Sequence, residues 1–361
     1  MADRAVIDTA HRRLISQRLL GTTFTRPKQV VEWLGAVQAQ DYSGAKWALG
    51  QRLQNASDDV VERAFAKGDV LRTHLLRPTW HFVAAADIRW LLMLTAPRVH
   101  AANAHMYRKL EIDAALVRRS HAALTKALAS GAQLTRDELR DVFARASVPT
   151  KGELRMGYIM MYAELEGLVC SGARRGKQFT YSLLDERAPS ARISDRNEAL
   201  AELARRYFAS RGPATVQDFA KWSGLTITDC RSGLEAVEDL LEHEVVDGSE
   251  YWQSAAKAVA HGRSTIAHVL SIYDEYVSGY KDRSAIGSAS VAKRLLAMGN
   301  ALSGIILVNG QIIGTWKRTF VGQVVHVRLQ PFTPLKKAER TAVDAAVEAY
   351  GQFLAMRVVR E

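Results

Sequence analysis

A run of predicted helices that ends in two short strands recurs three times along this 361-residue chain. In the first copy (residues 6–83), apolar residues recur every three or four positions, which predicts a series of helices. A proline is tolerated in the first turn of a helix, so the second helix begins near Pro27. The predicted helices cover 6–20, 27–34, 45–53 and 60–66, and the predicted strands cover 70–77 and 79–83.

The second and third copies begin with capping signals. Thr135 and Glu138 have the spacing of a capping box, and the segment 215–218 has similar chemistry. In the second copy (134–183) the two strands flank a basic turn, and in the third copy (215–253) they flank Asp247-Gly248. The predicted helices cover 135–146, 153–166, 215–222 and 228–240, and the strands cover 168–171, 178–183, 244–246 and 251–253.

Helices followed by a two-stranded ribbon are typical of a winged helix, and three approximate copies are more informative than one. The character changes after about residue 266, where short strands, an Asn309-Gly310 hairpin turn and a closing helix over 338–356 predict a small α+β unit. We therefore predict an α+β fold with three tandem winged-helix units and this C-terminal unit. The predicted boundaries are 1–128, 129–190, 191–258 and 259–361.

The net charge of +11 and the sequence pI of about 9.7 indicate a polyanionic partner, with nucleic acid as the first candidate. The alternative is a basic surface that only solvent contacts. Cys170 and Cys230 lie far apart without metal-ligand spacing, so no metal and no disulfide are expected. The chain lacks an evident signal peptide and any apolar run of membrane-spanning length, so we expect a cytoplasmic protein without membrane contact. No phosphate loop, dinucleotide fingerprint or nucleophile elbow is present, so no cofactor is expected.

The segment Gln38-Ala39-Gln40 lies between two predicted helices. On an extended backbone the two glutamines share a face, whereas on a helix they diverge by about 200°. A carboxamide does not ionise, but it can hold a water molecule with its oxygen and orient it with its amide. That is sufficient chemistry only for a leaving group that departs readily. The alternative is a pair of polar loop residues that bind backbone groups.

In this setting Gln38-Ala39-Gln40 resembles the paired-glutamine motif of the AlkZ/YcaQ-like bacterial DNA glycosylases. The resemblance covers nearly the whole chain and rests on the order and spacing of several further segments. These are Leu71-Arg72-Thr73-His74, Arg77-Pro78-Thr79-Trp80-His81, Tyr273-Asp274-Glu275-Tyr276, Gly279-Tyr280-Lys281-Asp282-Arg283, Val308-Asn309-Gly310 and Gly314-Thr315-Trp316.

The resemblance implies three winged helices around a concave face that binds double-stranded DNA, and excision of N7-alkylated purines, in some members from interstrand crosslinks. The alkylated base carries a positive charge that weakens its glycosidic bond, so water can attack without the carboxylates that most glycosidases need. Gln38 and Gln40 would position that water, and the hairpin around Asn309-Gly310 would approach the DNA. Some relatives carry an acid at the second motif position, so the role of the neighbouring Asp41 stays open.

Several cations are candidates for DNA contact. The basic turn holds Arg174, Arg175 and Lys177, whose charges repel one another unless an anion is near. Lys317 and Arg318 follow Trp316, and Arg77 is flanked by two histidines. Of these, His81 is a candidate for contact with a phosphate or an abasic sugar, as is His74, although both also fit a purely structural role. The cations between residues 98 and 126 do not form one helical stripe and fit a solvated surface.

Two alternatives remain at this point. Asp274-Glu275 could be an acid/base centre, although such a pair more often bonds nearby cations such as Lys281 or Arg283. The chain could also be a non-catalytic DNA binder, either a regulator or a drug-resistance protein. Regulators of this kind are usually dimers with symmetric recognition helices. Three unequal units in one chain instead suit a monomer that encloses one damaged site.

Overall fold

The computed structural model describes residues 2–152, 154–188, 190, 195–246, 248–255, 264–297 and 303–361, with only the backbone at 2–8. Four positions named in the sequence predictions lie outside the described residues. They are the predicted domain starts at 191 and 259, residue 153 of a predicted helix and residue 247 of a predicted turn. None of the described helices is both long and apolar enough to cross a membrane.

The first copy is a helix, a short strand, two further helices and a β-hairpin. Its three strands form an antiparallel sheet in the order β1-β3-β2, so the first strand pairs with the last. The capped ends support these boundaries, because Ser57 caps α4 and Gly68 closes it with a left-handed backbone. The elements are α2 (Pro27–Leu34), β1 (Val37–Gln38), α3 (Tyr42–Gly50), α4 (Asp58–Lys67), β2 (Val70–Leu75) and β3 (Thr79–Ala84).

The second copy repeats this order. The predicted capping box at Thr135 and Glu138 is present and starts α7. A two-residue strand before α7, which was not predicted, pairs with the last strand, so the sheet order is β4-β6-β5. The elements are α6 (Ala114–Leu128), β4 (Leu134–Thr135), α7 (Arg136–Arg145), α8 (Arg155–Leu165), β5 (Val169–Ser171) and β6 (Thr180–Leu183).

The third copy has the same order in reduced form. In place of a first strand, the single residue Ala214 pairs with Trp252 of the last strand. Thr215 then caps α11 with a capping box, as the sequence predicts. The elements are α10 (Arg196–Arg211), α11 (Val216–Ser223), α12 (Ile227–Glu235), a 3₁₀ turn (Glu238–Leu240), β7 (Leu241–Val246) and β8 (Ser249–Ser254).

The C-terminal region is a five-stranded sheet in the order β13-β12-β11-β10-β9, with α15 against it. Its last strand, which pairs in parallel with β12, was not predicted. The elements are β9 (Ala267–Leu270), α13 (Glu275–Ser278), α14 (Ala289–Ala297), β10 (Gly304–Val308), β11 (Gln311–Val321), β12 (Val324–Pro331), α15 (Lys337–Leu354) and β13 (Arg357–Arg360). Three helices outside these groups are α1 (Ala2–Ser16), α5 (Ile88–Lys109) and α9 (Leu184–Arg187).

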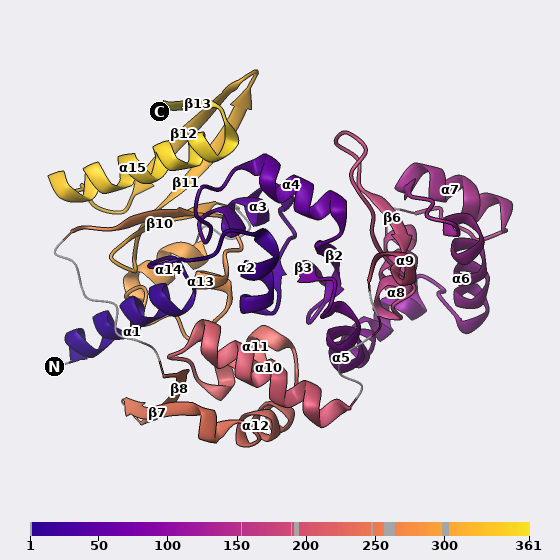
Figure 1. Ribbon diagram of the computed structural model, residues 1–361, viewed down its shortest axis with the longest axis horizontal. Coiled ribbons are helices and arrows are strands. Elements are labelled where there is room, and N and C mark those ends of the chain that lie inside the picture. The colour runs from indigo at the N-terminus through magenta and orange to yellow at the C-terminus, as the bar shows by residue number, and fades with distance from the viewer. Residues whose placement is uncertain are drawn as a thin grey trace.

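The Asn309-Gly310 turn joins β10 and β11 with positive φ at both residues, as expected of a two-residue hairpin. The tip is only half open, however, because Asn309 is exposed but the next residue is not. Gly310 is buried, and a Cβ there would meet the Tyr276 hydroxyl and Ala10. The turn that projects from this sheet joins β11 to β12, where Phe320 is 48% and Val321 59% exposed (Figure 1).

The hydrophobic cores do not follow the three copies one by one. The second copy encloses its own core, which contains Leu139, Phe143 and Ile159. In the first copy, α2, α3 and α4 share a core with the C-terminal sheet and α15, whereas β2 shares another with α5 and the third copy. The first copy therefore packs between the C-terminal region and the third copy, as Figure 1 shows.

A buried ion pair joins the first copy to the C-terminal region. Both Nη atoms of Arg52 donate to the Asp274 carboxylate, at 2.9 and 2.7 Å, and neither side chain is exposed. Arg52 also donates to the backbone oxygens of Gln17 and Ala48. The expected partners of Asp274, Lys281 and Arg283, are therefore wrong, because the fold brings a distant arginine to it.

Replacement Asp274→Asn should lower the free energy of unfolding by about 3–5 kcal/mol, because it leaves the Arg52 charge buried without a counter-charge. Asp185→Asn is the matched control. Its partner is Arg89, but Asp185 is 86% exposed, so the expected loss is below about 1 kcal/mol. Urea unfolding of both variants measures the difference, and equal losses would contradict the role given to the buried pair.

Candidate active site

Gln38 lies in an extended strand, as the spacing argument requires. In β1, Val37 pairs with Phe82 and Gln38 with His81 of β3. The burial alternates along the segment, since Val37 and Ala39 are in the core while Gln38 is half-buried and Gln40 exposed. Gln38 thus lies on the less buried side of the strand, whereas the exposed Gln40 stands at a bend just beyond the end of the strand.

The backbone around Ala39 is held by hydrogen bonds on both sides. The Ala39 amide donates to the Trp80 carbonyl at 2.7 Å, and the Ala39 carbonyl accepts from Nε of Arg72 at 3.1 Å. Arg72 is buried and lies over the rings of Trp80 and Phe179, at 4.2 and 4.5 Å from their centres. Burial lowers the pKa of Arg72 to about 10, so it remains a cation at neutral pH.

Each glutamine side chain is oriented by a donor. Nη2 of Arg77 donates to Oε1 of Gln38 at 3.2 Å, and the Trp80 amide donates to Oε1 of Gln40 at 3.4 Å. Because these donors can only meet an oxygen, they fix which way each carboxamide faces. Each oxygen keeps a second lone pair, and neither Nε2 donates to another residue of the described chain. Both groups can therefore still bind water.

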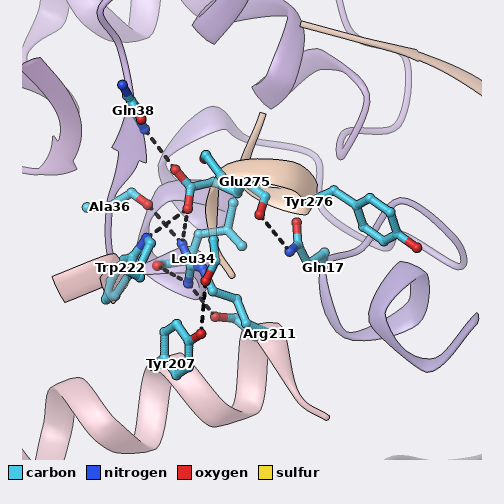
Figure 2. Close-up of polar contacts among 12 residues, drawn as sticks. Gln17, Leu34, Ala36, Gln38, Tyr207, Arg211, Trp222, Glu275 and Tyr276 are labelled. Atoms are coloured by element: carbon cyan, nitrogen blue, oxygen red, sulfur yellow. Dashed lines mark hydrogen bonds and ion pairs between the residues drawn. The ribbon is translucent and has the colours of Figure 1, made fainter. Parts of the chain in front are cut away.

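Beneath Gln38, a buried carboxylate joins three elements (Figure 2). Oε1 of Glu275 accepts a hydrogen bond from the backbone N–H of Gln38 at 2.9 Å. Its Oε2 accepts from Nη2 of Arg211 at 2.7 Å and from Nε1 of Trp222 at 2.8 Å. Burial alone would raise the pKa of Glu275, but the charge and hydrogen bond of Arg211, with the Gln38 amide, hold it below its ordinary value. Glu275 is thus a buried anion.

This geometry changes the interpretation of Asp274-Glu275. Both carboxylates are fully buried and are paired with the arginines Arg52 and Arg211. Neither pairs with Lys281 or Arg283, as the sequence suggested. Glu275 has no exposed surface from which to exchange a proton with a substrate, so it serves to hold the Gln38 strand and not as an acid/base group.

Asp41 occupies the N-cap position of α3, but its side chain does not cap the helix. Its Oδ2 instead accepts from Nη2 of Arg318 on β11, at 2.9 Å. Gly44 makes room for this arrangement, because a Cβ there would lie 2.5 Å from the Asp41 oxygen. Arg318, a candidate for DNA contact, is therefore already paired at the edge of the glutamine segment, whereas its neighbour Lys317 is exposed.

The histidines near Arg77 are buried. His81 has no exposed surface, its Nδ1 faces the Thr79 carbonyl at 2.9 Å, and burial with the charge of Arg77 lowers its pKa well below the usual value. It is therefore a neutral group without surface to offer a phosphate in this conformation. His74 lies against Trp80 and its Nδ1 contacts Glu164.

A group of buried polar atoms lies on the hairpin beside Gln38. Four of them have no hydrogen-bond partner within the described chain, although buried polar atoms are nearly always paired in folded proteins. They are Oγ1 of Thr73, Nε of Arg77, Oγ1 of Thr79 and Nε2 of His81. Thr73 and His81 pair directly in the sheet, and Gln38 pairs with His81 from the other side. The hairpin thus offers unused hydrogen-bonding capacity next to Gln38.

Two of the three cations in the basic turn of the second copy are already paired with carboxylates. Arg174 contacts Glu62 at 3.3 Å and lies over the ring of Tyr42, at 4.9 Å, so it fastens the turn to the first copy. Arg175 pairs with Glu138 at 2.7 Å. Lys177 is exposed and pairs with no carboxylate in the part of the chain described.

Of the residues that hold the segment, the sequence offered Glu275 only as a possible acid/base group and did not single out Arg72 or Arg211. Arg72 and Glu275 occur in segments that carried the family resemblance, but nothing in their spacing shows that they bind residues 38 and 39. Arg211 gave no signal, because an arginine at the end of a helix usually lies in solvent.

Comparison with known proteins adds an independent observation. The family model described as DNA glycosylase AlkZ-like matches residues 31–353. An interstrand DNA cross-link repair glycosylase of Streptomyces sahachiroi is 26% identical, with 96% of this chain and 97% of that protein covered. The solved structure of the Streptomyces sahachiroi DNA glycosylase AlkZ superposes with a TM-score of 0.79 at 21% identity, covering 98% of this chain and 99% of that one.

The neutral state of His81 has a consequence for stability. Below about pH 6.5 the unfolded chain binds a proton here while the folded protein does not, so the free energy of unfolding should fall as the pH falls from 7 to 5. His81→Asn, which keeps a donor for Thr79, should reduce this slope by up to about 1.4 kcal/mol per pH unit. Urea unfolding across this range measures it, and a variant slope as steep as that of the wild type would contradict the assignment.

Proposed function

Because this chain belongs to the AlkZ-like DNA glycosylase family, we propose that it hydrolyses the N-glycosidic bond of N7-alkylated purines in double-stranded DNA, including those in interstrand crosslinks. The observation that carries the proposal is the segment from Gln38 to Gln40, which continues β1 and bends before α3. Its backbone is fixed on both sides, and its two carboxamides are oriented while retaining the capacity to bind water.

The chemistry suits these groups. Water attacks C1′ of the sugar, the bond to N9 breaks, and its electron pair neutralises the positive charge on the alkylated base. The attacking water releases its proton to solvent. Since the base leaves as a neutral molecule, no strong acid is needed to protonate it, and the second carboxylate found in most glycosidases is not needed either. No covalent amine intermediate is required, so we propose a monofunctional glycosylase.

Two charged groups lie beside the carboxamides, one negative and one positive. The Asp41 carboxylate, although paired with Arg318, lies next to Gln40 and contributes negative charge to this edge of the site. The cation of Arg77 would oppose charge development at C1′ if it faced the sugar. Its hydrogen bond to Gln38 supports a role in orienting the carboxamide. The buried His81 is neutral and adds no further charge.

For the scaffold we propose three tandem winged helices at 1–128, 129–190 and 191–258, followed by the unit at 259–361, acting as a monomer. The shared order of helices and strands supports this division, as does the pairing of the first strand with the last in each copy. The β5–β6 turn and the β11–β12 hairpin project on the same side of the molecule in Figure 1. We propose that they flank the DNA, with Lys177 and Lys317 as exposed contacts.

The activity test is release of N7-methylguanine from alkylated duplex DNA. The wild type should release the base, and the double replacement Gln38→Ala with Gln40→Ala should slow single-turnover release by at least about a hundredfold. DNA affinity should change little, because the scaffold that binds phosphates is untouched. Gln217→Ala, at an exposed glutamine of α11, is the matched control. If the wild type binds DNA but releases no base from any alkylated or crosslinked duplex, a non-catalytic binder replaces the proposal.

We propose that the basic turn of the second copy contributes to DNA affinity through its positive charges. Replacing Arg174, Arg175 and Lys177 with glutamine should reduce the dependence of log Kd on log salt concentration by about 0.9 for each phosphate that is no longer neutralised. Lys177→Gln alone should account for the largest share, since Arg174 and Arg175 already have carboxylate partners. Fluorescence anisotropy from 50 to 200 mM salt provides the slopes. Identical slopes for the wild type and the triple variant would show that the basic turn does not contact DNA phosphates.

A further inference from the structure

Three cations from three separate segments lie near one another among the β2–β3 turn, α11 and α13. Arg77 stands in the tight turn between β2 and β3, Lys221 lies on α11, and Arg283 follows α13. Arg77 and Lys221 are half-buried, whereas Arg283 is exposed. Within the described part of the chain, none of the three forms an ion pair with a carboxylate. Partly buried cations are usually paired, so this excess of positive charge needs an explanation.

Each cation is anchored by one hydrogen bond and keeps its other donors. Nζ of Lys221 donates to the Ser278 carbonyl at 2.9 Å, and Nε of Arg283 donates to the adjacent Val277 carbonyl at 3.0 Å. Nη2 of Arg77 donates to Oε1 of Gln38 at 3.2 Å. Lys221 and Arg283 are thereby fixed on the same turn of α13. Lys221 keeps two N–H groups, and each arginine keeps donors on its Nη atoms.

The nearby carboxylates are already engaged. Glu275 is bound by Arg211, Trp222 and the Gln38 amide. Asp218 is fully buried and accepts the amides of Lys281 and Asp282, at 2.7 and 3.1 Å, as well as that of Thr215. Asp282 in turn accepts from Ser284. No described carboxylate at this site forms an ion pair with any of the three cations.

The electrostatics agree with this geometry. Burial, followed by the charges of Arg77 and Arg283, lowers the pKa of Lys221 to about 8. The pKa of Arg77 is lowered as well, by burial first, and Glu275 offsets only part of this. An anion placed among the cations would raise these pKa values towards their ordinary range and stabilise the charged forms.

The close approach of the Arg77 turn to α11 is built into the backbone. Gly224 ends α11 with φ 74°, and a Cβ there would lie 2.5 Å from the Leu76 carbonyl and 3.5 Å from Arg77. Leu76 itself, which is buried, adopts φ 60°, an unfavourable conformation for a leucine. Backbone strain of this kind persists where the surroundings enforce it, often at binding sites.

We propose that Arg77, Lys221 and Arg283 form a phosphate track that binds consecutive phosphodiesters of the strand whose damaged nucleotide faces Gln38. The proposal rests on the function given above. Arg283 is exposed, whereas Lys221 and Arg77 are half-buried and Arg77 contacts Gln38, so the three cations lead from the surface to the glutamine segment. Arginine forks and a lysine ammonium are the groups that bind phosphate oxygens in proteins. A phosphate on Arg77 would also fix the guanidinium that orients Gln38.

The test uses a duplex that carries one tetrahydrofuran abasic analogue, which has no base to release, so binding is measured apart from catalysis. Single phosphates on either side of the analogue are replaced in turn by neutral methylphosphonates. The wild type should lose affinity about tenfold at two or three adjacent positions on the analogue strand. Lys221→Gln and Arg283→Gln should each become insensitive to one of these positions and reduce the salt slope by about one.

The controls separate a phosphate contact from a folding effect. Lys126→Gln removes an exposed lysine on α6, far from α11 in Figure 1, and should keep the full wild-type pattern. Lys221→Arg keeps the charge and should restore the sensitivity that Lys221→Gln abolishes. If Lys221→Gln and Arg283→Gln both keep the wild-type methylphosphonate profile and salt slope, the proposed phosphate track is contradicted, even when the protein releases alkylated bases. If the wild type shows the profile but releases no base, the proposed activity fails and the track stands.

Discussion

The buried carboxylate of Glu275 determines how the first copy, the third copy and the C-terminal region meet. It receives the Gln38 amide from β1, a guanidinium from the end of α10 and the indole of Trp222 from α11. A carboxylate without solvent is stable only when such donors surround it, so these segments must be in place together. Arg211 also donates to the carbonyls of Leu34 and Ala36, just before β1. The position of Gln38 is therefore set by contacts across the whole fold.

The repeated copies explain why the glutamine segment is found only in the first of them. In the second copy the N-cap Thr135 is itself the last residue of the short strand, and in the third Thr215 follows the paired residue Ala214. In the first copy β1 ends at Gln38 and the N-cap is Asp41. Ala39 and Gln40 lie between the strand and the helix, where Arg72 and Trp80 hold them.

Local patterns predicted the elements well because each depends on neighbouring residues. The capping boxes at Thr135 and Thr215, the start of α2 at Pro27 and the Asn309-Gly310 turn are examples. The short strand β4, the last strand β13 and the buried partners of Asp274 and Glu275 were not predicted, because they depend on residues distant in sequence. The spacing set an extended backbone at Gln38 as the condition for a shared face, and the structure meets that condition at Gln38. Only the three-dimensional structure shows which residues hold this segment. It also shows the pairing of carboxylates with Arg174, Arg175 and Arg318.

The central claim is that the oriented carboxamides of Gln38 and Gln40 hold the attacking water between them. The most direct test is a high-resolution crystal structure of the protein on a duplex with a tetrahydrofuran analogue at the lesion position. We expect one water within hydrogen-bond distance of both carboxamides, about 2.7–3.2 Å, on the C1′ side of the analogue. An analogue sugar bound elsewhere on the protein, or no water shared by the two glutamines, would contradict the account.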